Sequence, residues 1–234
     1  MYEANNQKAT LVALNYNFAN INEFIEKLNS KDILKKYNLE QQEQIVKFSS
    51  SVQPPASILN DVRQFLPLKF VSKDTTIEIV YTQQELKLLI SKKNIDEKSF
   101  SDYAKLSNDF IDLKLSDLTA IGMNYSAEFN LKDEKLLLLR NETVEAVPNF
   151  EQNISFEFIL PLKDEKRGVL STYRIRKIDN DCKDHKYEIS VNFHYAIEKM
   201  TTSEKANKVN EIISLDMYKE FEAQCQRFLG LNNG

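Results

Sequence analysis

The side chains that could act as a general base near neutral pH are His185 and His194, the two histidines of this 234-residue chain. His194 lies in an alternating stretch, where it shares one side of a predicted strand with polar residues. A second alternating stretch, residues 117–131, carries Asn124 and Glu128 on its polar side. We expect that side to be a solvated surface, or else the wall of a polar pocket or interface. The predicted polar strand face consists of Asn124, Glu128, Glu188, Asn192 and His194.

His185 lies in the polar segment DNDCKDHK, which predicts a solvated turn. Cys182 and Asp184 are close to it, but a closed zinc site needs four ligands and no second Cys/His pair is nearby. A catalytic pair of Cys182 and His185 would also need an orienting group and an oxyanion site. The other cysteine, Cys225, occupies an apolar helical position and is expected to be a buried small hydrophobe. We therefore predict no metal site.

Glycine usage restricts cofactor chemistry. The chain has 4 glycines, at positions 122, 168, 230 and 234, and none of them lies in a GxGxxG or GxxxxGKS motif of the kind that cradles phosphates. The sequence also holds no H-E-x-x-H motif and no G-x-S-x-G elbow. We expect no cofactor and favour a protein that is not an enzyme. The alternative is an enzyme whose scattered carboxylates meet His194 in space.

A concentration of basic residues stands out in a chain whose net charge is -4. It runs from Lys163 to Lys177 and predicts a basic hairpin. Such a hairpin could contact phosphates or an acidic partner, and charged residues also protect edge strands from aggregation. The candidate partner-binding residues are Lys166, Arg167, Arg174, Arg176 and Lys177.

The composition is that of a folded protein, with 42% hydrophobic and 28% charged residues. No apolar run approaches the roughly 18 residues of a transmembrane helix, and the N-terminal residues do not resemble a signal peptide. Because the cysteines are few and show no CxxC spacing, we expect a reducing, cytoplasmic compartment and no membrane association.

The longest element is a strand within residues 117–131, where apolar residues alternate with small or polar ones. An Asp-capped helix over residues 96–114 precedes it. Other predicted strands cover residues 8–18, 44–52, 68–73, 75–82, 86–90, 136–140, 154–160, 169–175 and 187–197. Other predicted helices begin near residue 21, near residue 203 and at residue 214, and residues 85–91 also allow a helix.

This order predicts an α+β protein with large antiparallel sheets and helices packed on one face. In the first strand, Val12 and Leu14 share one side and Ala13 lies on the other, which predicts Val12 and Leu14 toward the core. The chain is expected to form one domain over residues 1–234, with two sub-lobes, 1–92 and 93–234, as the alternative.

The passage YAKLSNDFIDLKLSDLTAIGMNYSAEF resembles part of a sporadically distributed bacterial family of uncharacterised proteins. Members carry a helix followed by a strand that reads roughly Arg, hydrophobic, Gly, hydrophobic, Arg, Tyr, hydrophobic, Asn. Ile121, Gly122, Met123 and Tyr125 match it, whereas Ala120 and Asn124 stand where the family has arginines. The resemblance covers about residues 66–130 and implies a bacterial cytoplasmic protein without an assigned activity.

The leading hypothesis is a non-enzymatic protein that acts through a protein partner or by self-association, through a sheet edge, the basic hairpin or an aromatic surface. Antitoxin, immunity and accessory roles fit this profile. A module that binds nucleic acid through the basic hairpin is a further alternative.

Overall fold

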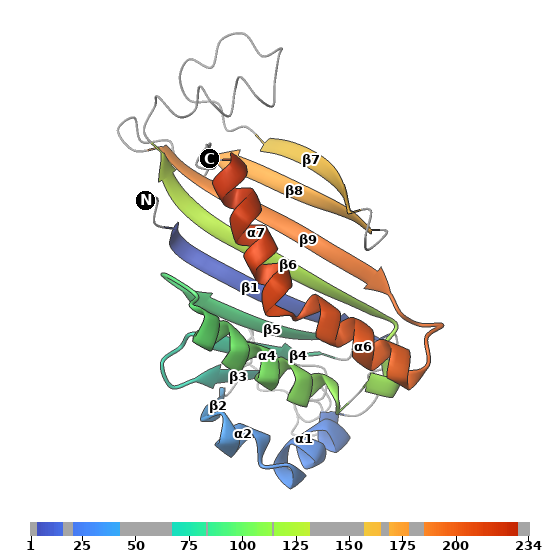
Figure 1. Cartoon of the computed structure of the whole chain (residues 1–234). Helices are drawn as coiled ribbons and strands as arrows, with labels where there is room; N and C mark the ends of the chain where they lie inside the picture. Colours follow the sequence, from blue (N-terminus) through green and yellow to red (C-terminus); the bar gives the residue numbers. More distant parts are fainter. Residues whose placement is uncertain are drawn as a thin grey trace, which may run out of the picture.

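In the computed structural model, the chain is described over residues 4–15, 21–42, 67–82, 84–113, 115–131, 157–164, 169–177 and 185–228. The strands of these residues form one 9-stranded antiparallel sheet, in the order β2-β3-β4-β5-β1-β6-β9-β8-β7 (Figure 1). The N-terminal strand β1 lies between β5 and β6 and pairs with both. The strands are β1 Ala4–Leu14, β2 Leu39–Gln42, β3 Leu68–Ser72, β4 Ile77–Tyr81, β5 Glu85–Lys92, β6 Ala120–Leu131, β7 Glu157–Asp164, β8 Val169–Lys177 and β9 His185–Ala196.

All the described helices cover one face of the sheet, with α7 and α6 running across β1, β6 and β9 and with α4 over β5 (Figure 1). Aromatic rings fill the space between α4, α7 and the sheet. Phe100 stacks on Tyr218 at a centroid distance of 4.8 Å, and Tyr125 stacks on Phe221 at 5.6 Å. This arrangement confirms the predicted α+β class. The helices are α1 Ile21–Ser30, α2 Ile33–Lys36, α4 Glu97–Ile111, the 3-10 helix η1 Leu115–Asp117, α6 Thr202–Ile212 and α7 Leu215–Phe228.

The period of two along β6 separates core from surface as predicted. Met123, Tyr125 and Ala127 are at most 1% exposed, whereas Asn124 and Ser126 between them are only partly buried. Paired residues of β6 and β9 lie on the same face of the sheet. Tyr125 is paired with Val191, and Asn124 is paired with Asn192. The odd-numbered residues of both strands therefore face the helices.

Local signals in the sequence define where the helices begin. The Asp96 side chain accepts a hydrogen bond of 2.7 Å from the Ser99 amide and so caps α4. Thr201 and Glu204 form a capping box on α6, in which each side chain accepts from the backbone amide of the other. The predicted helix starts at residues 96 and 203 are thus confirmed within one or two residues.

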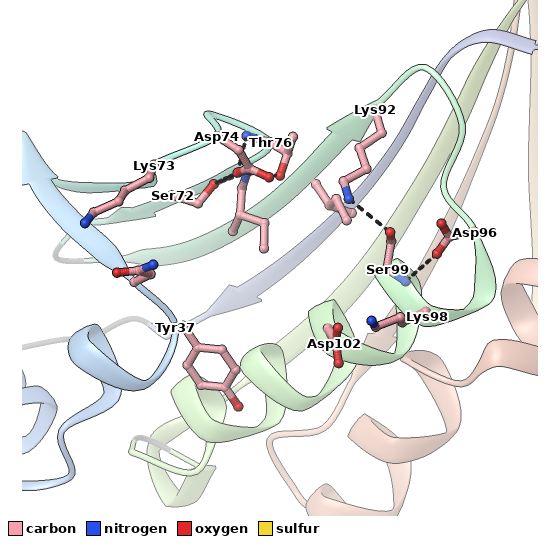
Figure 2. A pocket seen from close by; sticks show the side chains of 13 residues that line it. Tyr37, Ser72, Lys73, Asp74, Thr76, Lys92, Asp96, Lys98, Ser99 and Asp102 are labelled. Atoms are coloured by element: carbon pink, nitrogen blue, oxygen red, sulfur yellow. Dashed lines mark hydrogen bonds between the residues drawn. The ribbon is translucent and has the colours of Figure 1, made fainter.

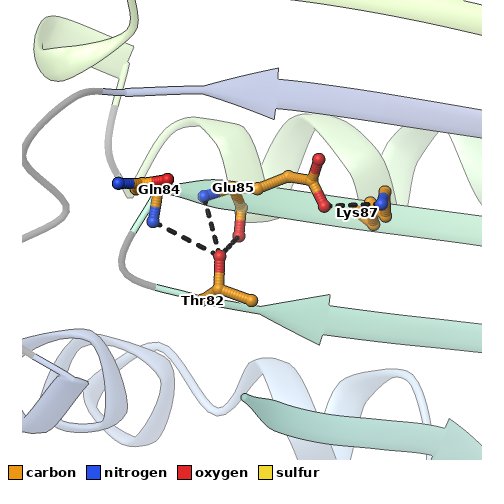
Figure 3. Close-up of polar contacts among 4 residues, drawn as sticks. All are labelled: Thr82, Gln84, Glu85 and Lys87. Carbon is orange, nitrogen blue, oxygen red and sulfur yellow. Dashed lines mark hydrogen bonds and ion pairs between the residues drawn. The ribbon is translucent and has the colours of Figure 1, made fainter. Parts of the chain in front are cut away.

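The turn between β4 and β5 fixes the register of β5 (Figure 3). The Thr82 hydroxyl oxygen accepts hydrogen bonds from the amides of Gln84 and Glu85, at 3.3 and 3.0 Å. The Thr82 amide donates to the Glu85 carbonyl at 2.8 Å. Residues 85–91 consequently continue as a strand, and the helical alternative is wrong.

Two interpretations of the N-terminal half are corrected. In β1 it is Leu11 and Ala13 that are fully buried, while Val12 and Leu14 lie on the partly exposed side. Both sides of β1 carry apolar residues, so alternation alone did not distinguish the core side. Strand β2 follows directly after α2 and was not predicted, because Glu40, Gln41 and Gln42 are all polar. The strands predicted over 44–52 and 136–140 lie outside the described residues.

A tyrosine hydroxyl joins α4 to the central sheet. Tyr103 is fully buried, and its hydroxyl accepts from the Leu11 amide at 2.9 Å and donates to the Leu88 carbonyl at 2.7 Å. Leu11 and Leu88 are partners in the β1–β5 ladder. The hydroxyl therefore links two backbone groups of neighbouring strands, and burial raises the Tyr103 pKa.

Candidate functional site

The polar residues predicted on β6 and β9 share the face of the sheet opposite the helices, which we call the outer face. Asn124 is paired with Asn192, Glu128 with Glu188, and Gly122 with His194. Asn192 and His194 are exposed, and the other predicted residues are partly buried. The sheet register thus brings all five residues of the predicted polar strand face together.

The same register adds part of the predicted basic hairpin to the outer face. Arg174 on β8 is exposed and is paired with Ser190, and Arg176 is paired with Glu188. Lys177 is paired with Tyr187, a position in the row that faces the helices. Lys166 and Arg167 lie outside the described residues.

One row across the centre of the outer face carries two cationic residues with two serines between them. The pairing runs from Lys8 on β1 through Ser126 and Ser190 to Arg174 on β8. Neighbouring strands lie about 4.8 Å apart, so three steps separate the two cationic positions by about 14 Å. The small polar side chains of Ser126 and Ser190 lie between these two positions.

Two carboxylates of the outer face, those of Glu128 and Glu85, are paired with lysines. Glu128 lies 2.6 Å from the Lys186 ammonium and accepts a hydrogen bond of 3.1 Å from Asn6. Partial burial acts to raise the pKa of Glu128, but the hydrogen bonds from Lys186 and Asn6 outweigh it and hold the pKa below its usual value.

Glu85 and Lys87 pair in the same way at 2.7 Å (Figure 3). Both belong to the row that the β1–β5 register places on the outer face, opposite Leu14 and Val12. These ion pairs neutralise acidic groups that would otherwise repel an anionic partner.

Gly122 allows the His194 ring to lie close to the sheet. A Cβ atom at position 122 would be 3.2 Å from the Phe193 carbonyl oxygen and 3.5 Å from His194 Nδ1. The glycine matched the resemblance noted in the sequence, and its structural role is this close approach. Since His194 is exposed, its surroundings are those of a surface side chain.

His185 lies in a strand, although the sequence predicted a turn at this position. His185 is the first residue of β9, paired with Leu131, rather than a turn residue. Cys182 and Asp184 lie outside the described residues. Among the residues that the structure describes, no group of three or more His, Cys, Asp or Glu side chains could hold a metal ion. Cys225 is 3% exposed, as a small core residue would be.

A cavity of about 540 Å³ lies on the other side of the sheet, at one end of α4 (Figure 2). Its walls come from the end of α2, the β3–β4 turn, the end of β5 and the first two turns of α4. Sequence reasoning missed it because these segments are far apart in the chain. The strands on either side of residue 74 and the Asp-capped helix at residue 96 were predicted, but nothing in their spacing indicated that these segments face each other.

Comparisons with known proteins give little further information. No family model and no curated protein matches the chain. Among solved structures, it is similar to the duplicated taurocyamine kinase from Schistosoma mansoni with bound transition state analog components, with 10% identity and a TM-score of 0.40. The alignment covers 92% of this chain and 33% of that chain, so this chain spans about a third of the kinase's length. A TM-score this low supports no argument about function. In the described helices, no segment is long and apolar enough to span a membrane.

Proposed function

We propose that this protein is a non-catalytic binding protein whose outer face docks an acidic segment of a protein partner. The observation that carries the proposal is the position of Arg174. It was predicted as part of a basic hairpin, and the register sets it beside the polar face of β6 and β9. Arg174 of the basic set is thereby a neighbour of the polar residues on β6 and β9, and it is exposed together with Asn192 and His194.

The edges of the sheet are less suited to pairing with another chain. The edge strand β2 has 4 residues, three of them exposed and polar. The opposite edge strand β7 contains Pro161, which has no amide hydrogen to donate. Short or proline-containing edges are common protections against edge-to-edge pairing. A partner is thus better accommodated on the outer face.

An aromatic docking surface is also disfavoured. Among the described side chains, every phenylalanine and tyrosine is buried except Tyr37, which is half-buried at the end of α2. The rings therefore stabilise the core and are not available to a partner. Of the three surfaces considered from the sequence, the one that includes the basic strand β8 has the strongest support.

Charge complementarity favours an acidic partner. Glu128 and Glu85 form ion pairs with lysines, while Lys8 and Arg174 carry positive charge on either side of Ser126 and Ser190. The chain as a whole has a net charge of -4, so this face differs from the average surface. An extended acidic peptide could place carboxylates at both cations and hydrogen-bond to the serines and asparagines between them. Binding of this type suits the antitoxin, immunity or accessory roles of a bacterial cytoplasmic protein.

A photo-crosslinking experiment tests this proposal. A photoreactive amino acid replaces Asn192, which is exposed at the centre of the outer face, and the control replaces Glu26, a residue of α1 on the helical side. We expect a crosslinked adduct from position 192 that contains an acidic protein. The adduct should be absent from position 26 and should be lost when Arg174→Glu is added.

Three results would contradict the proposal. An adduct of twice the chain's mass would identify a second copy as the occupant, and a nucleic-acid adduct would favour the alternative that the basic residues bind phosphates. Equal crosslinking from positions 192 and 26 would show that the outer face has no special role.

A further inference from the structure

We propose that the cavity between the β3–β4 turn and α4 binds a small organic phosphate, with its phosphate group on lysines and its apolar body against Ile77, Ile90 and Tyr37. This inference is independent of the proposed function. Ile90 and Lys92 belong to the row of β5 that faces the helices, so the cavity and the outer face lie on opposite sides of the sheet.

Three lysines from three different segments line the cavity. Lys73 comes from the β3–β4 turn, Lys92 from the end of β5, and Lys98 from the first turn of α4 (Figure 2). Lys92 donates a hydrogen bond of 3.0 Å to the neutral hydroxyl of Ser99. Among the described residues, the Lys73 and Lys98 ammonium groups have no hydrogen-bond or ion-pair partner.

Three aspartates also line the cavity, but their carboxylates are already engaged. Asp74 Oδ1 accepts hydrogen bonds from the Ser72 hydroxyl at 2.6 Å, the Thr76 hydroxyl at 2.8 Å and the Thr76 amide at 3.2 Å. Asp96 Oδ1 accepts from the Ser99 amide at 2.7 Å and caps α4. These two carboxylates stabilise the turn and the helix that form the walls.

Asp102 lies 3.7 Å from the ammonium of Lys105, one turn along the same helix. All three acidic residues of the cavity therefore have local partners, while the lysines have spare donors. The formal charge of the lining is neutral, since three lysines balance three aspartates, but the hydrogen-bond donors that remain available belong to the lysines. An anion can accept charge-assisted hydrogen bonds from these donors.

The positions of the aspartates and of Lys92 agree with this reading. The hydrogen bond from the Ser72 hydroxyl lowers the pKa of Asp74, and the hydrogen bond from the Ser99 amide lowers the pKa of Asp96. The positive charge of Lys92 also lowers both pKa values. Lys92 lies beside the start of α4, because its ammonium donates to the Ser99 hydroxyl at 3.0 Å.

The apolar side of the cavity explains why we expect an organic body on the phosphate. Ile90 is 1% exposed and Ile77 is partly buried, and the two are paired across β4 and β5. The Tyr37 ring is held in place because its hydroxyl donates to Asp109 at 2.7 Å. An aromatic or aliphatic group can pack on these side chains while a dianionic phosphate meets the lysines.

An NMR titration of the full chain tests the inference, with phenyl phosphate, inorganic phosphate and benzoate as separate probes. We expect saturable amide shifts at the cavity residues, with phenyl phosphate binding about tenfold more tightly than either other probe. The double variant Lys73→Met/Lys98→Met should weaken phenyl phosphate binding about tenfold or more, since each lysine is expected to make a charge-assisted contact.

Two control variants make the result specific. Lys87→Met removes a lysine of the same strand as Lys92, but from the outer face, and should leave the affinity unchanged. Arg174→Glu should also have no effect, which separates this inference from the proposed function. Absence of saturable binding below about 10 mM, equal affinity for inorganic phosphate or benzoate, or an unchanged affinity in the double variant would each overturn the inference.

Discussion

Replacing Tyr103 by Phe tests how α4 is joined to the sheet. The change keeps the ring, which packs against Phe100 at a centroid distance of 6.0 Å, and removes only the hydroxyl. The Leu11 amide and the Leu88 carbonyl then lose their partner in a fully buried place. A buried backbone group without a partner costs about 1–3 kcal/mol, so two such groups should lower the free energy of unfolding by about 2–4 kcal/mol after partial relaxation of the strands.

Urea denaturation followed by circular dichroism measures this loss. With an m-value near 2.5 kcal/mol/M, the midpoint should fall by about 1 M or more, with no change in m. Tyr37→Phe is the matched control, because it removes a hydroxyl that bonds to Asp109 in a partly exposed place. That control should lose less than about 1 kcal/mol.

Equal, small losses in the Tyr103 and Tyr37 variants would refute the reasoning. They would mean that β1 and β5 close the gap and pair directly when the hydroxyl is absent. Amide hydrogen exchange at Leu11 would then be as slow in the variant as in the wild type, whereas we expect it to be faster.

Three further predictions concern single side chains. Lys205 is 5% exposed and donates to the backbone carbonyls of Ser116 and Leu118, at 2.9 and 2.6 Å. Lys205→Met should therefore lower the free energy of unfolding by about 2 kcal/mol in urea denaturation. Lys208 is more exposed, and Lys208→Met should change this free energy by less than about 1 kcal/mol. Burial raises the pKa of Glu222, so the stability contributed by the protonated side chain is fully present below pH 4 and is lost as the pH rises through the native pKa. Glu222→Gln should therefore be more stable than wild type at pH 7 but not at pH 4. An equal difference in stability at the two pH values would contradict this prediction. Gly122→Ala would place a Cβ atom too close to the Phe193 carbonyl oxygen, at 3.2 Å, and in contact with the His194 ring, at 3.5 Å. We expect a loss of about 1 kcal/mol of stability and a shifted His194 resonance in NMR spectra. An unchanged stability and spectrum would show that the strands move apart without cost.

The sequence was most informative where one period dominated a segment. The buried row of β6 and the apolar stripe of α4 were both predicted, because burial on one side leaves a regular pattern. For strand β1 the predicted core side was wrong, because Val12 on the outer face is as apolar as Leu11 in the core. Strand β2 gave no signal, because an exposed edge strand of polar residues resembles a loop.

The candidate surfaces were recognised from the sequence only in separate pieces. Strand alternation placed Asn192 and His194 on one side of β9, and charge counting drew attention to Arg174. Their proximity depends on the register of β8 and β9, which pairs Arg174 with Ser190 and cannot be read from either strand alone. The cavity beside α4 was missed for the same reason, since its lysines are brought together only by the folding of the sheet end.

The outer face is proposed to bind an acidic protein through Arg174 and its neighbours. The most direct measurement is the dissociation constant of the partner identified by crosslinking at Asn192, for wild type and for Arg174→Glu, at low and high salt. We predict at least a tenfold weakening by the substitution at low salt and a much smaller difference at high salt, because screening removes the charge term. Equal affinities at low salt would contradict the claim.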